Sequence, residues 1–313
     1  MAIKLGLVGV GVIARAQHLP VLAARTDFTL IAAANRGAPA EGVRNFSSLA
    51  EMLEGAPEVE AIALCTPPAA RAADARLALD QGKHVLLEKP PGATLSEVAA
   101  LAALASAKGV TLNTSWHSRH APGVAQAKVW LANKRLASVE IDWREDVRHW
   151  HPGQDWIFAP GGLGVFDPGI NALSILTHIL PLPFALQSGK LAFPENRQAP
   201  IAADLVFADE GGAPIRASFD FLQTGPQTWE IRITTRDGEQ LTLKHGGAEL
   251  HINGAVIAPA ADVDPLHAEY VGVYNEFRDL ISARASGVDL APLRHVADAF
   301  MLGERTRAPA FVF

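Results

Sequence analysis

The stretch Ile3-Lys4-Leu5-Gly6-Leu7-Val8-Gly9-Val10-Gly11-Val12-Ile13-Ala14 decides the fold of this chain. It joins an apolar run, which predicts a β-strand, to the helical pattern of Val12–Arg25. The junction has the G-x-G-x-x-A arrangement, in which Gly9 permits a tight turn, Gly11 lets backbone approach a pyrophosphate and Ala14 lets the helix pack closely on the strand. The N-terminus of that helix presents free N–H groups to phosphates. We therefore predict a dinucleotide-binding turn at this junction.

Strands and helices continue to alternate through the first third of the chain. Further strands are predicted at Phe28–Ala34, Ala61–Thr66, His84–Leu87 and Val110–Thr114. Ser47 and Ser96 are predicted to cap two of the intervening helices. Alternation of this kind is typical of a parallel sheet with helices on both faces.

The pattern changes after Trp116. Helices are predicted at Gly123–Lys134 and Gly169–Ile179, and two more, Leu266–Ala285 and Leu293–Arg305, end the chain. The remaining strands are predicted at Val139–Trp143, Phe184–Ala192, Ala202–Phe207, Ile215–Leu222, Trp229–Thr235, Gln240–Lys244 and Glu249–Ile252. Short glycine-containing turns join several of them, which favours antiparallel pairing.

We therefore expect an α/β Rossmann dinucleotide-binding domain at residues 1–118. An α+β domain for substrate binding and oligomerisation should follow at residues 119–313, with a large, open, mostly antiparallel sheet, and the last helix could pack back on the first domain. Because apolar sheet faces need cover, the open face of that sheet is a candidate surface for a homo-oligomer.

Composition excludes several classes of partner. The 313 residues carry a net charge of -6 without a block of Lys or Arg, so we expect no nucleic-acid partner. The single cysteine, Cys65, excludes an internal disulfide and fits a reducing compartment. No signal peptide is recognisable, and no apolar run approaches the roughly 18 residues of a membrane span. We predict a soluble, cytoplasmic protein without a membrane partner.

The end of the second strand bears on which nicotinamide cofactor is preferred. An acidic residue there would bind the ribose 2′-hydroxyl of NAD and repel the 2′-phosphate of NADP. The chain has Asn35-Arg36 instead, and Arg36 can pair with a phosphate. We predict NADP preference or use of both cofactors; the alternative is that Arg36 is a solvated loop residue.

Three motifs together resemble those of the Gfo/Idh/MocA oxidoreductase family: the glycine turn, Thr66-Pro67-Pro68 after the third strand and Glu88-Lys89-Pro90 after the fourth. The resemblance covers essentially the whole chain and implies a nicotinamide cofactor, NAD or NADP. The residues expected to bind it are Gly9, Gly11, Val12, Ile13, Asn35, Arg36, Thr66, Pro67, Glu88 and Lys89.

Further segments are similar to the aldose 1-dehydrogenase branch of that family. They are the stretches at residues 116–119, 143–145, 149–156 and 167–171. The similarity implies that Lys89, Asp167 and Asn171 surround the reacting carbon of a small aldose sugar. It also implies a sugar pocket lined by His117, Glu145, Trp150, His151 and Trp229, with Trp229 the loosest assignment. The expected reaction is oxidation of C1 of L-arabinose, D-galactose or D-fucose pyranose to the aldono-lactone.

Asn171 departs from the wider family, in which a histidine at this place serves as the general base. An amide can donate and accept hydrogen bonds, and so position a hydroxyl, but it cannot titrate. The four-residue spacing puts Asp167 and Asn171 about one helical turn apart. The base is therefore either Lys89, which we favour, or Asp167 with Lys89 as the group that polarises the hydroxyl.

Other interpretations of these residues stay open. A related sugar or a cyclic polyol could be the substrate, and a non-catalytic sugar sensor that binds NAD(P) is a further alternative. Histidines 117, 120, 149 and 151 have spacings that could supply metal ligands, but no cysteine assists them, and we expect no metal.

Overall fold

The computed structural model describes residues 2–258 and 264–313. The chain forms two compact units. The first contains Met1–His117 and Tyr270–Leu290, and the second contains Ser118–Glu269 and Ala291–Phe313. The helix that rejoins the first unit is therefore α8 (Pro265–Ala283) from Tyr270 onward, whereas the last helix, α9 (Ala291–Leu302), belongs to the second.

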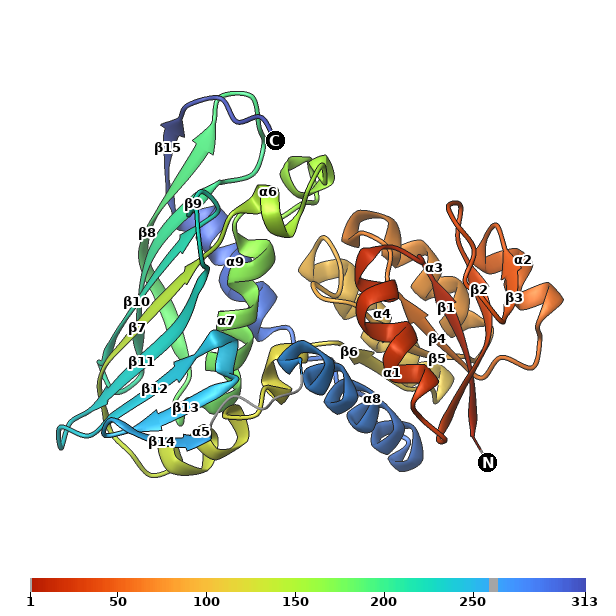
Figure 1. Cartoon of the computed structure of the whole chain (residues 1–313), viewed down its shortest axis with the longest axis horizontal. Helices are drawn as coiled ribbons and strands as arrows, with labels where there is room; N and C mark the ends of the chain where they lie inside the picture. The colour runs from red at the N-terminus through yellow and green to blue at the C-terminus, as the bar shows by residue number, and fades with distance from the viewer. Residues whose placement is uncertain (1, 259–263) are drawn as a thin grey trace. The chain divides into compact units, whose positions relative to one another are not determined.

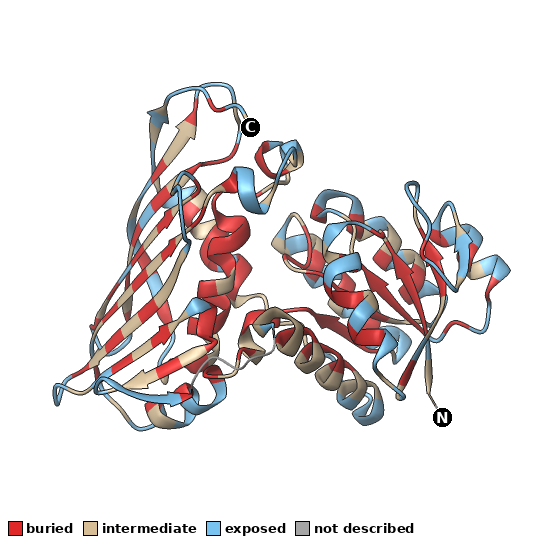
Figure 2. Ribbon diagram, in the orientation of Figure 1, coloured by how far each residue is buried: buried red, intermediate tan, exposed pale blue. Residues whose placement is uncertain are grey.

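A parallel sheet forms the centre of the first unit. Its six described strands lie in the order β3-β2-β1-β4-β5-β6, which is the Rossmann arrangement (Figure 1). They are β1 (Ile3–Val8), β2 (Phe28–Ala34), β3 (Arg44–Phe46), β4 (Ala61–Leu64), β5 (His84–Leu87) and β6 (Leu112–Thr114). Most of their residues are apolar and buried, as expected for strands covered on both faces (Figure 2).

The helices of this unit begin at capping residues that the sequence only partly indicates. They are η1 (Ala14–His18), α1 (Leu19–Ala23), α2 (Leu49–Gly55), α3 (Pro68–Asp80) and α4 (Leu95–Lys108). The cap of α2 is Ser48, whose side chain accepts the N–H of Glu51, and not Ser47. The cap of α4 is Thr94, which forms a reciprocal capping box with Glu97, and not Ser96.

A mixed, mostly antiparallel sheet forms the second unit. Its nine described strands lie in the order β14-β13-β12-β11-β7-β10-β9-β8-β15, and only the pairs β7–β10 and β8–β15 are parallel. They are β7 (Leu136–Arg144), β8 (Phe184–Pro194), β9 (Ala202–Asp209), β10 (Pro214–Asp220), β11 (Thr228–Thr235), β12 (Gln240–Lys244), β13 (Glu249–Ile252), β14 (Ala255–Ala258) and β15 (Glu304–Ala308). The predicted fold class is thus confirmed in both domains.

Helices cover one face of this second sheet. Contacts join α7 (Phe166–Ile179) to β7, α9 to β8, and α5 (Val124–Leu131) to β12 (Figure 1). The short helices are η2 (His117–His120), α6 (Val147–Trp150), η3 (Asp155–Phe158) and η4 (His245–Gly247). A Cβ on Gly169 would lie 3.0 Å from the ring of Phe219, so glycine allows α7 to lie close to β10.

The opposite face of the sheet is charged and not apolar, which corrects the reason given above for oligomerisation. Arg232 pairs with Asp142 at 2.6 Å and with Glu230 at 3.3 Å, and Arg216 pairs with Glu140 at 3.6 Å. Arg216 stands directly opposite Glu140 on the adjacent strand, and on β11 Arg232 stands opposite Glu140 and Glu230 opposite Asp142. Strand residues of the second unit accordingly alternate between buried and partly exposed (Figure 2).

Candidate functional site

The glycine turn after β1 has the shape that a dinucleotide requires. Gly9 has a φ of +88°, and a Cβ there would lie 2.9 Å from the backbone nitrogen of Thr66. A Cβ on Gly11 would meet nothing within 4 Å, so the backbone at Gly11 faces open space. Because a bound pyrophosphate needs close approach to backbone N–H groups, these two glycines fit such a cofactor.

Hydrogen bonds connect the loop after β2 to the glycine turn and to the helix that follows it. Asn35 accepts the backbone N–H of Val10 at 3.3 Å and donates to the carbonyl of Ala38 at 2.9 Å, while Arg36 is exposed. The Arg15 guanidinium donates to the same Ala38 carbonyl at 2.6 Å. Sequence reasoning missed Arg15 as a second cation at this loop, although it directly follows the Ala14 of the motif.

Hydrogen bonds from Arg71 hold the backbone of the loop that carries Lys89. The Arg71 side chain donates to the backbone carbonyls of Glu88, Pro90 and Thr66. The Lys89–Pro90 peptide bond is cis. Arg71 is a further residue that sequence reasoning missed, because only the fold brings the start of α3 next to the end of β5.

Glu88 is buried among protein partners. Its Oε1 accepts the Tyr270 hydroxyl at 2.6 Å and lies 3.1 Å from His18 Nε2, and its Oε2 accepts the backbone N–H of Lys89 at 2.8 Å. His18 Nδ1 lies 2.8 Å from the hydroxyl of Tyr274. His18 is fully buried, and its two polar partners Glu88 and Tyr274 come from distant parts of the chain.

These contacts make His18 and Glu88 an ion pair. Burial would raise the pKa of the Glu88 carboxyl, but the hydrogen bond and charge of His18, helped by His117 and Tyr270, lower that pKa to about 2. Burial also opposes the charged form of His18, yet Cys65, Tyr274 and Glu88 together raise the pKa of His18 well above 6.5. The pair is thus charged at neutral pH.

His117 lies at the end of the first unit, in η2. Its ring is buried and stacks on Tyr270, with the ring centroids 5.3 Å apart and the planes inclined by 15°. Tyr270 therefore contacts both Glu88 and a predicted sugar-binding residue.

The second unit brings three of its predicted residues into one cluster. Nε2 of His151 lies 3.6 Å from Oε1 of Glu145 and 3.6 Å from Oδ2 of Asp167. The two carboxylates are only 2% and 3% exposed. Glu145 follows β7, His151 ends α6 and Asp167 lies in the first turn of α7, so the cluster exists only in the folded unit.

Indole rings line one side of this cluster. Trp229 on β11 donates its Nε1–H to Oε2 of Glu145 at 2.9 Å. Its ring lies 5.0 Å from that of Trp150, which is 37% exposed, and 5.9 Å from the nearly parallel ring of Trp143. Trp143 is buried, on the apolar face of β7. Trp229, the loosest assignment from sequence, thus has a direct contact with the cluster.

Asn171 follows Asp167 by one turn of α7 and is partly exposed. Of the predicted catalytic residues, Asp167 and Asn171 thus lie in the second unit, whereas Lys89 lies in the first. The cofactor residues and His117 also belong to the first unit, and Glu145, Trp150, His151 and Trp229 belong to the second.

In residues 2–258 and 264–313, no group of three or more His, Cys, Asp or Glu side chains could hold a metal ion. Within the same ranges no helix is both long enough and apolar enough to cross a membrane.

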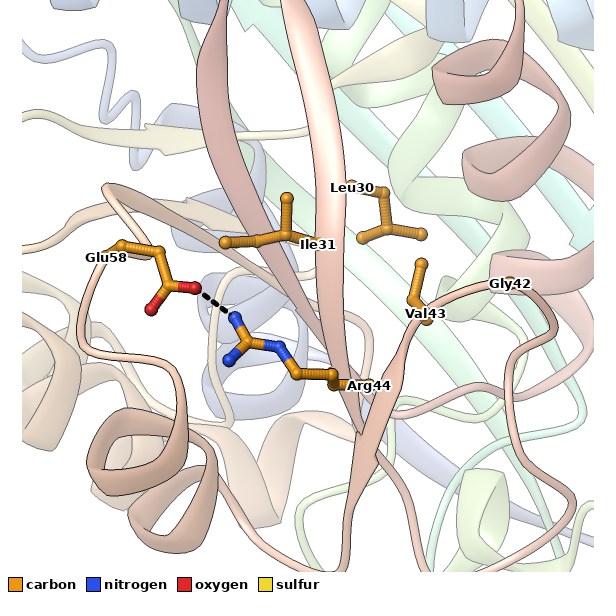
Figure 3. A pocket seen from close by; sticks show the side chains of 6 residues that line it. All are labelled: Leu30, Ile31, Gly42, Val43, Arg44 and Glu58. Carbon is orange, nitrogen blue, oxygen red and sulfur yellow. Dashed lines mark hydrogen bonds and ion pairs between the residues drawn. The ribbon is translucent and has the colours of Figure 1, made fainter.

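An open pocket of about 640 Å³ lies at the β2–β3 edge (Figure 3). Its lining residues are Leu30, Ile31, Gly42, Val43, Arg44 and Glu58. The last two form an ion pair with each other, and no predicted site residue lines this pocket.

A Rossmann sheet with a glycine turn, followed by an open-sheet domain with a buried carboxylate–histidine cluster, defines a two-domain dinucleotide-binding protein. Residues 3–115 match the Gfo/Idh/MocA family, an oxidoreductase family with an NAD-binding Rossmann fold. The chain is 48% identical to a galactose 1-dehydrogenase of Pseudomonas fluorescens over 309 residues, which is 99% of this chain and 98% of that protein. The chain belongs to the Gfo/Idh/MocA family and is an oxidoreductase.

Solved structures agree with this assignment. A D-galactose-1-dehydrogenase from Rhizobium etli is 53% identical, with a TM-score of 0.93 over 99% of this chain and 98% of that one. An inositol dehydrogenase homologue from Azotobacter vinelandii, solved with NAD+, is 20% identical with a TM-score of 0.79 over 91% of this chain and 87% of that one, and it shares the fold.

Proposed function

We propose that this chain is an NAD(P)-dependent aldose 1-dehydrogenase that oxidises C1 of D-galactose, L-arabinose or D-fucose pyranose to the aldono-lactone. The observation that carries the proposal is the Glu145–His151–Asp167 cluster beside Trp229 and Trp150. Carboxylates and imidazole bind hydroxyls, and flat apolar sugar faces pack on indole rings. Similarity to galactose 1-dehydrogenases along the whole chain supports the same substrate class.

The cluster also supports a neutral sugar as the proposed substrate. Two buried carboxylates face one histidine, so a phosphate or carboxylate group on the sugar would be repelled. D-Galactose and L-arabinose pyranoses share the configuration of their ring hydroxyls and differ by the hydroxymethyl group at C5. A pocket that binds the ring hydroxyls should therefore accept both.

The proposed reaction separates a hydride from a proton. The glycine turn would hold the cofactor, whose nicotinamide ring would supply the acceptor for the C1 hydride. Lys89 is proposed to take the O1 proton as its neutral amine, so that the electron pair of the O–H bond forms the carbonyl of the lactone and Lys89 becomes an ammonium ion. Asp167 and Asn171 are proposed to position the hydroxyl, with Asp167 as the alternative base.

Arg36 and Arg15 support a proposed preference for NADP or use of both cofactors, because both guanidinium groups lie at the loop after β2. The remaining cofactor contacts proposed for this chain are those of the glycine turn and of the loops that start at Thr66 and Glu88.

The experiment that tests this function follows formation of reduced cofactor by absorbance with NADP or NAD. The panel contains D-galactose, L-arabinose, D-fucose, D-glucose, D-xylose, myo-inositol and D-galacturonate. We expect kcat/KM for the first three to exceed that for the others by at least about tenfold, since each mispaired hydroxyl leaves a buried polar group unsatisfied. Equal rates with D-glucose, or activity with myo-inositol alone, would contradict the proposal.

A further inference from the structure

The Glu88 carboxylate binds the backbone N–H of Lys89, the residue proposed as the base. Oε2 accepts the N–H of Lys89 at 2.8 Å, and Oε1 is fixed from the other side by His18 and Tyr270. Glu88 is 4% exposed and His18 and Tyr270 are fully buried, so solvent does not compete for these contacts.

We propose that Glu88 is a positioning residue for Lys89, and that His18 and Tyr270 act through it. This inference rests on the proposed function in one respect, because it takes Lys89 to act on the sugar. It assigns Glu88 a role other than the direct cofactor contact expected from the motif, since both carboxylate oxygens already accept hydrogen bonds from protein groups.

Position 88 requires a carboxylate side chain. One oxygen faces the Tyr270 hydroxyl and an imidazolium, and the other faces a backbone N–H, and each of these three groups is a donor. A glutamine has the same shape but replaces one acceptor with a donor NH₂ group, which must then face another donor. The charged pair also makes each hydrogen bond shorter and stronger than a neutral one.

Tyr270 extends the same network to the sugar side. Its hydroxyl binds Glu88, and its ring stacks on His117. One side chain of α8 thus fixes both the Lys89 loop and a residue proposed to bind the sugar. Arg71 adds a second restraint, because it holds the backbone carbonyls of Glu88 and Pro90.

The test compares Glu88→Gln and Tyr270→Phe with Glu97→Gln in the full-length protein. Glu97 provides a matched control, since its side chain also accepts a backbone N–H, that of Thr94, but lies in the capping box of α4. We expect Glu88→Gln to lower kcat by about 10- to 100-fold, since misplacing a reacting group by about 1 Å has effects of that size. Tyr270→Phe removes one donor and keeps the ring on His117, so its loss of kcat should be smaller.

Three further readouts separate positioning from a loss of stability. The cofactor Kd should change by less than about threefold, because binding energy at the glycine turn is untouched. The kinetic isotope effect with C1-deuterated D-galactose should rise in Glu88→Gln, since the chemical step becomes slower than product release. Glu97→Gln should lower Tm without changing kcat or the isotope effect.

Amide hydrogen exchange of Lys89 supplies a readout that does not need sugar oxidation. We expect this amide to exchange faster in Glu88→Gln than in the wild type, with no change in Glu97→Gln. An unchanged kcat or an unchanged Lys89 amide would overturn the positioning role, and so would a cofactor Kd that weakens as much as kcat falls. A wild type that oxidises no sugar would instead remove the proposed function, and the amide measurement would still decide whether Glu88 anchors Lys89. If Glu88→Gln fails to fold, Tyr270→Phe decides by the same criteria.

Discussion

Substitution of Lys89 should slow the chemical step while leaving cofactor binding nearly unchanged. Lys89→Ala removes the proposed base but leaves the glycine turn intact. We expect kcat to fall by about 10²- to 10⁴-fold, the usual effect of losing a general base, while cofactor Kd stays nearly unchanged. Steady-state kinetics together with titration of cofactor fluorescence would check this. A kcat close to that of the wild type would favour Asp167 as the base.

Arg36 should decide how strongly the 2′-phosphate is recognised. Its side chain is exposed at the loop after β2, where it can reach a phosphate without desolvation. Arg36→Ala should lower kcat/KM with NADP by about 10- to 100-fold, since hydrogen bonds to charged groups contribute about 1.5–3 kcal/mol. The value with NAD should change little. Equal losses with the two cofactors would show that Arg36 does not read the phosphate.

The role of a single residue can be predicted from the sequence where that residue belongs to a motif. Gly9 and Gly11 follow from the strand–turn–helix pattern alone, and the structure gives both the backbone geometry that a dinucleotide needs. The part played by His18 was not predictable, because its partners Glu88 and Tyr274 are 70 and 256 residues away along the chain. A lone histidine on a helical pattern gives no sign of such partners.

The bounds of helices and strands were predicted well where the sequence pattern is local. β12 and β13 have the predicted bounds, since each is a short alternating run between turn residues. α7 begins at Phe166, three residues before the predicted start at Gly169, because Pro168 fits the first turn of a helix. β15 was missed: its first two residues, Glu304 and Arg305, lie at the end of the predicted helix Leu293–Arg305, and the segment forms a strand by pairing with β8.

The His18–Glu88 pair joins η1 to the loop after β5, so it should make the stability of the first unit depend on pH. The pKa of Glu88 is lower in the folded protein than its ordinary 4.5, so its stabilisation is present above that pH and is lost as pH falls toward about 2. The pKa of His18 is raised, so its stabilisation is present below 6.5 and is lost as pH rises through the raised value. Both contributions are therefore present between pH 4.5 and 6.5.

His18→Gln should lower the free energy of unfolding by about 3–5 kcal/mol in that window, since it leaves a buried carboxylate without its charged partner. The difference from the wild type should shrink as pH rises beyond the window. Urea denaturation across a pH series would measure it, with the exposed His149→Gln as the control. A difference that stays constant from about pH 5 to 9 would argue against an ion pair.

For the whole molecule, the charged open face of the second sheet is the surface through which we expect copies of the chain to associate. Rows of opposite charge on adjacent strands can pair with the same rows of a second copy in a two-fold dimer. Arg232→Glu should lower the mass measured by light scattering after size-exclusion chromatography, whereas Lys128→Glu, on the helix-covered side, should not. An unchanged mass in Arg232→Glu, or a wild type that is already monomeric, would remove this face as an interface.

The chain leaves the first unit after His117 and returns to it at Tyr270, which limits where the protein can be cut or joined to another. Because the first unit is completed by Tyr270–Leu290, a protein cut after residue 117 would lack the two tyrosines that bind Glu88 and His18, and we expect it not to fold alone. The stretch from Ser118 to Glu269 is in effect an insertion within the Rossmann unit. Grafting a different second unit onto this Rossmann unit therefore needs matched junctions near residues 117 and 270, and a chimera joined at the first point alone would lack the hydrogen bonds from Tyr270 to Glu88 and from Tyr274 to His18.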